Sequence, residues 1–443
     1  MKSLLVALPL FSLSLFLFMV WPQTMLANEG NPNILAFLIM AQVLAVIYFS
    51  ILAIGRKCRL ELRANRGLWM FLILVGLVTR LTIVVGIGEH TTLSDDVYRY
   101  VWEGKLVANG GNPYVTAPED MESCELADST IFPNINHPWL PTIYPPLSMG
   151  LFTVAYLISG DSVLGFKWLS FFFELATALG IMLLIRRYGL PHWTFLVYWF
   201  SPLVLIEFLV SNHQDILAMP FLIGTILFAE GKRPILCGLS LAAMALIKPL
   251  GLFVAPALLL FFTGRQRIQL VAAAALVGLL AYLPFVADAG LEVFGSLWTY
   301  LGTWQYNGSV FQLLALFMEP SHSRIVCLVG FVLAVSAILF ARRKSANWLK
   351  TSLYLFVCYV VFAPSLFPWY LVWMLPLLVL YPNPALLSLS GTIFLSYYVL
   401  IGYYADGEWS KQGWVVIVEY VPFYGLAVWL LVRHFRKKRL CRL

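Results

Sequence analysis

Residues 34–54 read ILAFLIMAQVLAVIYFSILAI, and the chain continues as GRKCRLELR over residues 55–63. The first segment carries no charge and is long enough to cross a bilayer, which takes about 20 apolar residues in a helix. The second segment is rich in Arg and Lys, which gather at the cytoplasmic ends of membrane helices. Together they predict a helix that spans a membrane and ends on the cytoplasmic side.

The same pattern recurs along the whole chain. Of its 443 residues, 61% are apolar and 12% are charged, about half the charged share of an ordinary soluble protein. So few charges exclude a soluble protein, and the apolar content excludes a disordered one. We expect residues 1–443 to form a single all-α polytopic transmembrane bundle of about 12–14 spans. The apolar runs, of which 369–381 could instead be re-entrant, are 4–22, 34–54, 68–88, 163–185, 192–210, 215–230, 234–247, 250–262, 268–286, 323–341, 350–366, 369–381, 384–402 and 413–432.

The basic residues give this bundle a direction. If the N-terminus is cytoplasmic, the inner loops and tail hold 22 of the 29 Lys and Arg residues but only two acids, Glu61 and Glu230. This distribution predicts that both termini are cytoplasmic. The basic tail 433–443 is then expected to sit at the anionic inner leaflet and not to bind nucleic acid. Residues 1–22 are interpreted as an uncleaved helix, because the apolar stretch is longer than that of a signal peptide.

One long outer loop, 89–146, begins with the sequence SDDVYRYVWEGKLVANGGNPY at residue 94. Ser94 is a good N-cap, acids are favoured in a first helical turn, and glycines end helices. We therefore expect a helix over 95–108 that carries Asp95 and Asp96 at the mouth of the bundle. One interpretation is an active-site acid pair. The other is a surface helix with capping acids and an ion-pair ladder through Arg99 and Glu103.

The rest of the loop is expected to return to the outer surface. Residues 136–146, NHPWLPTIYPP, are proline-rich and should be rigid and extended, with Tyr144 among them. The apolar segment 147–160 is too short to cross comfortably, and a crossing would invert every later loop. We interpret it as re-entrant or interfacial, so that 89–160 forms one extracytoplasmic catalytic loop.

Other polar residues are predicted near the same face. Ionisable residues in or beside spans are costly and are candidates for function. Arg80, Lys248 and Arg324 could each instead reach lipid headgroups. His213 could be a structural histidine whose hydrogen bonds are satisfied. The candidates for binding a phosphate group or the rest of a substrate are Arg80, Arg99, Tyr144, Asn212, His213, Lys248 and Arg324. The six cysteines show neither a disulfide framework nor a zinc-ligand spacing.

Five segments of the chain, taken in their order, resemble a known family. They are the acid motif, NHPWLPTIYPP, the NHQD segment at 212–215, LIKPLG at 246–251 and PWYLVW at 368–373. They look like the bacterial polyprenyl-phosphate-dependent glycosyltransferases of the GT-C class, in particular its mannosyltransferase-like branch. The resemblance covers about residues 68–380. Relatives often carry His before the PWY segment, where this chain has Phe367.

The resemblance implies an enzyme that takes a hexose, preferably mannose, from a polyprenyl-phosphate carrier. The acceptor is a glycan or glycolipid at the extracytoplasmic face of the inner membrane, and the catalytic acid corresponds to Asp95 or Asp96. Such a carboxylate can take the proton of the attacking hydroxyl, while cations stabilise the leaving phosphate. Direct displacement inverts the anomeric carbon. No metal-ligand set is evident, although a divalent cation could bridge Asp95, Asp96 and the phosphate.

Two other classes stay open from the sequence. A transporter or lipid-linked-sugar flippase would be expected to show internal repeats and polar groups near the midplane. We find no repeat, and the polar residues gather at one face. A catalytically silent scaffold of the cell envelope is the third possibility, against which the acid pair argues.

Overall fold

The computed structural model describes residues 33–58, 66–409 and 412–440. The first expected span, 4–22, therefore lies outside the described residues. Within them the fold is built of helices, and the only β-type pairings are isolated bridges between Tyr306 or Asn307 and Ser365. The all-α architecture expected from the composition is confirmed.

The helices fall into long ones that form the bundle and short ones that interrupt it. The α-helices are α3 (Ile34–Cys58), α4 (Arg66–Ile87), α5 (Asp96–Ala108), α6 (Pro146–Ser159), α7 (Leu164–Arg187), α8 (Leu196–Trp199), α9 (Pro202–Val204), α10 (Asp215–Glu230), α11 (Pro234–Ala245), α12 (Ala255–Phe261), α13 (Gly264–Ala289), α14 (Gly295–Thr303), α15 (Ser309–Leu314), α16 (Pro320–Arg342), α17 (Trp348–Phe362), α18 (Leu375–Leu380), α19 (Pro384–Thr392), α20 (Val399–Asp406) and α21 (Gly413–Leu440). The tighter 3-10 turns are η2 (Pro118–Met121), η3 (Phe132–Asn134), η4 (His192–Phe195), η6 (Pro249–Val254), η7 (Gly290–Phe294), η8 (Pro368–Met374) and η9 (Ile393–Tyr398), and η5 (Leu205–Val210) is a π-helix.

Seven helical segments of the described residues are long and apolar enough to cross a membrane. They are Ile34–Cys58, Arg66–Ile87, Leu164–Arg187, Gly264–Thr303, Pro320–Arg342, Pro384–Asp406 and Gly413–His434. The expected span 192–210 is broken into two helical pieces that meet at an angle of 40°. The break falls at Ser201–Pro202, because proline cannot continue the hydrogen-bond ladder of the preceding helix. Counted as one span, this bent pair gives an eighth.

Other expected spans are shorter than a full crossing. They correspond to α10 and to the apolar helices Pro234–Ala245, Pro249–Phe261, Trp348–Phe362 and Pro368–Leu380. Three of these helices begin at a proline, which is favoured at the first position of a helix. A proline there also prevents the preceding residues from continuing into the same helix. The estimate of 12–14 spans included these shorter helices, beside the seven or eight described segments that are long enough to cross.

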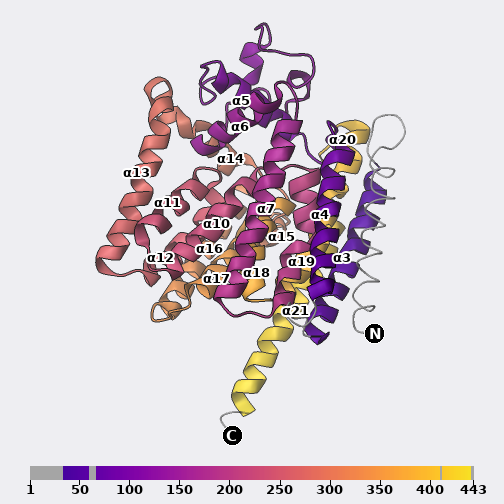
Figure 1. Cartoon of the computed structure of the whole chain (residues 1–443), viewed down its shortest axis with the longest axis vertical. Helices are drawn as coiled ribbons and strands as arrows, with labels where there is room; N and C mark the ends of the chain where they lie inside the picture. Colours follow the sequence, from indigo (N-terminus) through magenta and orange to yellow (C-terminus); the bar gives the residue numbers. More distant parts are fainter. Residues whose placement is uncertain (1–32, 59–65, 410–411, 441–443) are drawn as a thin grey trace.

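The outer helices show the surface that a membrane requires. In the segment Gly264–Thr303, which begins with α13, and in α16, only 6% of the most apolar stretch is buried inside the structure. The exposed side chains include Leu279, Leu283 and Leu328. In Figure 1 the helices α5 and α6 lie at one end of the bundle, and the C-terminal end of α21 projects from the opposite end. The long loop and the basic tail therefore belong to opposite ends of the molecule.

The helix expected over 95–108 is confirmed as α5. Its N-cap is Asp95 and not Ser94, but the Ser94 hydroxyl still accepts a hydrogen bond from the Asp96 amide at 3.2 Å. The helix ends where expected, because Gly110 adopts a φ of +81° and the Gly111 amide returns to the Leu106 carbonyl.

Helix α5 packs closely against α6 at this end of the bundle. A Cβ at Gly104 would lie 2.3 Å from the Phe152 carbonyl oxygen, so only glycine allows the two backbones to approach this closely. The start of α6 is held in turn by the break between α11 and η6, since the Leu147 and Ser148 amides both donate to the Leu246 carbonyl.

Candidate active site

A single amide holds the two adjacent acids together. The Asn136 Nδ2 donates to Asp95 Oδ1 at 2.7 Å and to Asp96 Oδ1 at 2.8 Å. Asn136 begins the proline-rich segment, about 40 residues beyond the acids in the sequence. The acids are therefore not free caps on a surface helix, because the return of the loop positions them.

Arg99 fixes the loop that carries Asn136. Its side chain forms an ion pair with Glu103 at 2.8 Å and donates to the carbonyls of Asn136, His137 and Leu140. Glu103 is held from its other side by the Thr142 hydroxyl at 2.8 Å. The expected Arg99–Glu103 pair is thus present, and the guanidinium is occupied by backbone carbonyls of the proline-rich segment.

The two acids differ in their electrostatic surroundings. Burial and the charge of Asp96 raise the pKa of Asp95 to about 6, although the Asn136 amide opposes the shift. Burial also raises the pKa of Asp96, but the nearby His213 and the Asn136 amide outweigh burial and hold it below its ordinary value. Asp95 is therefore suited to accept a proton near neutral pH, while Asp96 stays ionised beside it.

His213 faces the acid pair from the segment before α10. Its Nδ1 lies 3.5 Å from Asp96 Oδ2, and its ring stacks on Trp369 with centroids 3.6 Å apart. Asn212 presents the histidine from a left-handed backbone conformation, with a φ of +56°, and its own Nδ2 donates to the Val210 carbonyl. Asn212 thus shapes the turn, and His213 reaches the acids.

Lys248 adds a positive charge to the same neighbourhood. It sits in extended backbone between α11 and η6, and its charge contributes to the lowered pKa of Asp96. Its Nζ lies 2.6 Å from Asp215 Oδ2, and Asp215 also accepts from the Trp373 indole at 2.6 Å. The Lys248 ammonium lies 4.4 Å from the centre of the Tyr370 ring. The break at LIKPLG therefore delivers a cation close to the acids.

Two of the expected phosphate ligands lie in other surroundings. Arg80 is wholly buried between α4 and α7, where it forms an ion pair with Glu174 at 2.8 Å and lies 3.7 Å from the Trp199 ring centre. Arg324 donates to the carbonyls of Leu301, Thr303 and Trp304 at the end of α14. Neither side chain contacts the acid pair.

Tyr144 belongs to an aromatic layer beneath the acids. Its ring packs edge-on against Tyr100 and Phe152, with centroids 5.3 and 5.6 Å apart. The Tyr100 hydroxyl lies 3.4 Å from Asp96 Oδ2. Tyr144 therefore supports the site through Tyr100.

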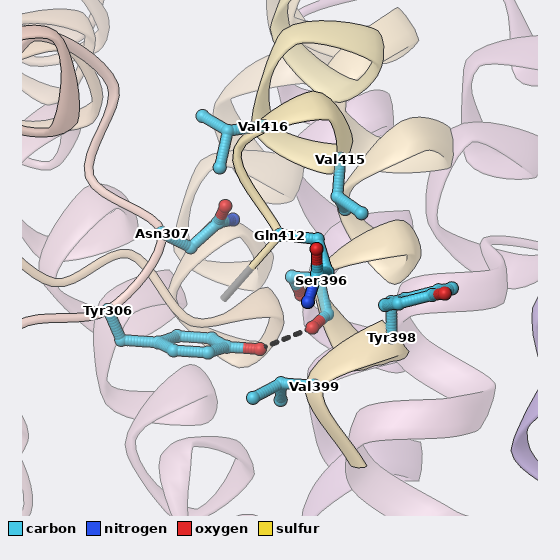
Figure 2. Close-up of a pocket in the computed structure, with 8 residues that line it drawn as sticks. All are labelled: Tyr306, Asn307, Ser396, Tyr398, Val399, Gln412, Val415 and Val416. Carbon is cyan, nitrogen blue, oxygen red and sulfur yellow. Dashed lines mark hydrogen bonds between the residues drawn. The ribbon is translucent and has the colours of Figure 1, made fainter. Parts of the chain in front are cut away.

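A row of rings leads from His213 to a pocket. Trp369 stacks on Phe367, and Phe367 stacks on Tyr306, each with centroids 4.5 Å apart. Tyr306 lines a pocket of about 250 Å³, a volume that includes space open to solvent, and its hydroxyl donates to the Ser396 carbonyl at 2.6 Å (Figure 2). The other lining residues are Asn307, Tyr398, Val399, Gln412, Val415 and Val416. Phe367 is thus part of the row of rings between this pocket and His213.

Sequence reasoning missed several residues of this site. Asn136 was noted only as part of NHPWLPTIYPP, and Asp215 only as the last residue of the NHQD segment. Glu207 was overlooked inside an apolar run, although an acid within a predicted span is itself a signal of function. Within the described ranges, no group of three or more His, Cys, Asp and Glu residues is arranged to hold a metal ion.

Residues 21–264 match a protein family described as alpha-(1->6)-mannopyranosyltransferase, N-terminal domain. The match covers more than half of the chain and includes the acid pair, Asn136, His213 and Lys248. No sequence among the curated proteins matches the chain.

Proposed function

Because the chain belongs to the alpha-(1->6)-mannopyranosyltransferase family and is a mannosyltransferase of the membrane, we propose that it takes mannose from a polyprenyl-phosphate carrier. The acceptor in this proposal is a glycan or glycolipid at the extracytoplasmic face. The observation that carries the proposal is the acid pair Asp95–Asp96, held by Asn136 and facing His213 and Lys248. Family membership favours a transferase over the transporter and scaffold alternatives.

In the proposed reaction an acceptor hydroxyl attacks the anomeric carbon of the mannosyl phosphate. The new bond joins the acceptor oxygen to the anomeric carbon, and the bond from that carbon to the phosphate oxygen breaks. The electron pair leaves with the polyprenyl phosphate, and the hydroxyl proton passes to Asp95. The raised pKa of Asp95 supports its role as the base, since a base works best when its pKa lies near the working pH.

The proposal assigns the leaving phosphate to Lys248. It is the cation whose charge acts on Asp96, and an ammonium group can stabilise the charge that develops on the phosphate. Because the mannosyl carbon is attacked opposite the phosphate, its configuration inverts, and a β-linked donor gives an α-mannoside. The family description names a 1→6 linkage, so the proposed acceptor group is the primary hydroxyl of a mannoside.

The proposal is tested with purified full-length protein in lipid nanodiscs and a mannoside acceptor. The donors are polyprenyl-phospho-mannose, polyprenyl-phospho-glucose and a nucleotide-linked mannose. Mass spectrometry follows the released carrier, and NMR gives the anomeric configuration of the product. We expect an α-mannoside and free polyprenyl phosphate from the first donor alone. Transfer from the nucleotide-linked sugar, or a β-mannoside from a β-linked donor, would contradict the proposal.

The orientation is a separate part of the proposal. We place α5 and the acid pair outside and the C-terminal end of α21 in the cytoplasm, because the inner loops would then hold 22 of the 29 basic residues. This orientation is tested in a variant whose six native cysteines are replaced by serine. Single cysteines introduced at Glu119 and at Arg433 are labelled with a membrane-impermeant reagent on intact cells. The expected result is labelling at position 119 alone.

A further inference from the structure

A buried acid that the proposed reaction does not use lies directly behind His213. Glu207 belongs to the π-helix η5 and is completely buried. Its Oε2 lies 3.5 Å from His213 Nε2 and accepts a hydrogen bond from the Tyr397 hydroxyl at 2.9 Å. Its Oε1 has no hydrogen-bond partner in the part of the chain that the structure describes. A buried acid with half its hydrogen-bonding capacity unused calls for an explanation beyond packing.

The imidazole of His213 stands between two carboxyl groups. Nδ1 lies 3.5 Å from Asp96 Oδ2, and Nε2 lies 3.5 Å from Glu207 Oε2. The stacked Trp369 fixes the plane of the ring. The His213 amide donates to the Glu207 carbonyl at 2.9 Å, which also fixes the backbone. The ring therefore has one orientation, and each nitrogen has one acid in front of it.

The charges of Asp96, His213 and Glu207 restrict where the protons between these three groups lie. A neutral imidazole carries one N–H, so one nitrogen would turn a lone pair toward an ionised carboxylate if both acids were charged. One proton shared between Glu207 and Nε2 removes that repulsion and leaves an N–H on Nδ1, directed at Asp96. The other charged groups that act on His213 are Asp215 and Lys248, which pair with each other at 2.6 Å. Tyr397 is the titratable group on the far side of Glu207.

We propose that Glu207 is a positioning residue for mannosyl transfer, which acts by holding His213 with its Nδ1–H directed at Asp96. This inference rests on the proposed function, because it gives Asp96 a role beside the base. A histidine is commonly fixed in one tautomer by the group bound to its other nitrogen. Here the Nδ1–H stabilises the ionised Asp96, and the charge of Asp96 in turn raises the pKa of Asp95.

Two substitutions separate the proton-holding role from simple packing. Glu207→Gln keeps the shape and can donate an amide N–H to His213 Nε2, so the Nδ1–H is retained. Glu207→Leu keeps the bulk but leaves Nε2 without a partner. The matched controls are Glu419→Gln and Glu419→Leu. Glu419 is equally buried but contacts Asn307, away from the acid pair.

We expect Glu207→Leu to lower kcat about 10–100-fold, with a KM for the polyprenyl-phospho-mannose donor within about twofold of wild type. Without Glu207 the imidazole is positioned only by Asp96 and Trp369, so its Nδ1–H is less well directed at Asp96. The doubly ionised acid pair is then less stable, and the acidic limb of the kcat profile moves up by about one pH unit. Glu207→Gln should stay within about threefold of wild type with an unmoved limb. The Glu419 variants should leave the limb in place.

All variants are measured at equal amounts of folded protein, determined by thermal unfolding in detergent. If Glu207→Leu does not fold, Glu207→Met replaces it, because the flexible methionine fits irregular cavities. A double variant with His213→Asn should be no slower than His213→Asn alone, since Glu207 acts through the histidine. Full kcat with an unmoved limb in Glu207→Leu would overturn the inference, as would equal losses in the Leu and Gln variants without a pH shift.

The same assay separates this inference from the proposed function. Wild type, Asp95→Asn and Asp96→Asn are run beside the Glu207 variants. If both aspartate variants lose transfer and Glu207→Leu behaves as wild type, only the inference about Glu207 fails. If both aspartate variants keep wild-type transfer, the proposed acid site fails, and the role of Glu207 fails with it.

Discussion

Two clusters of buried charge in this molecule are built in opposite ways. In the bundle, Arg80 donates to both oxygens of Glu174 at 2.8 Å and to the carbonyls of Gly76 and Trp199 at 3.0 Å. At the end of the bundle, His213 lies 3.5 Å from each of two acids, and neither ring nitrogen makes a hydrogen bond within the described residues. The first cluster is saturated with partners, and the second is not.

The difference shows how to tell a structural charge from a functional one in this chain. A buried ion pair is tolerated when its geometry is good and its remaining hydrogen bonds are made, as for Arg80 and Glu174. A cluster that keeps unused hydrogen-bonding capacity beside an acid with a raised pKa is suited to chemistry. Residue type alone does not distinguish the two, since both combine a carboxylate with a basic side chain.

The largest expected effect concerns the acids around His213, the cluster whose hydrogen-bonding capacity is partly unused. Asp95→Asn should lower kcat about 10²–10⁴-fold, because the acceptor hydroxyl loses its base. The variant should unfold at the temperature of wild type, since the Asn side chain can keep a hydrogen bond to Asn136. Carrier release from polyprenyl-phospho-mannose, normalised to folded protein, measures the effect. A kcat within about threefold of wild type would remove Asp95 from the mechanism.

Changes to the Arg80–Glu174 pair, whose hydrogen bonds are all made, should alter the folding stability. Glu174→Leu leaves the Arg80 charge buried and unpaired, which should cost about 3–5 kcal/mol of folding free energy. The kcat of the protein that still folds should stay within about twofold of wild type. The double variant Arg80→Met/Glu174→Leu should recover most of the stability, because both charges are gone. Unfolding in mixed micelles measures the stability. A loss of kcat with unchanged stability would show that Arg80 serves the reaction.

Lys248 should show a smaller effect, on donor use. Lys248→Met is expected to lower kcat/KM for polyprenyl-phospho-mannose about 10–100-fold, because the leaving phosphate loses its cation. The matched control is Lys105→Met, which removes a lysine of α5 that pairs with Asp128 and Asp161 and should leave kcat/KM unchanged. Steady-state assays over a range of donor concentrations measure both variants. Equal losses in the two would point to a general effect of removing a buried ammonium group.

Arg324 should have the smallest effect. Its hydrogen bonds go to the carbonyls at the end of α14, so Arg324→Ala should cost about 1 kcal/mol of stability. The donor KM should change by less than about twofold if Arg324 does not bind the phosphate. A tenfold or larger rise in the donor KM would bring Arg324 into the site.

Much of the local structure could be predicted from the sequence. The limits of α5 follow from its acids and glycines, and the break at Lys248 follows from Pro249 and Gly251. These features depend on residues that are close together in the chain. Glu174 and Glu419 lie inside apolar runs of the sequence, where an acid needs partners, and they contact Arg80 and Asn307.

The partners of the charged side chains could not be predicted, because they come from distant segments. Arg80 meets an acid 94 residues away, and Asp96 meets an amide 40 residues away. The apolar run that ends near Val210 was expected to be one regular span. Pro202 marks the break in this run, but a hydropathy pattern does not indicate the π-helix that places Glu207 behind His213.

The central claim is that Asp95 accepts the proton while Asp96 stays charged beside it. The most direct test is the pH dependence of kcat for wild type and for Asp96→Asn. Wild type should lose activity as the pH falls through about 6, because protonated Asp95 cannot act as a base. Asp96→Asn removes the neighbouring charge that raises the pKa of Asp95, so its acidic limb should move to lower pH. An acidic limb that stays in place, or moves to higher pH, in Asp96→Asn would contradict the account.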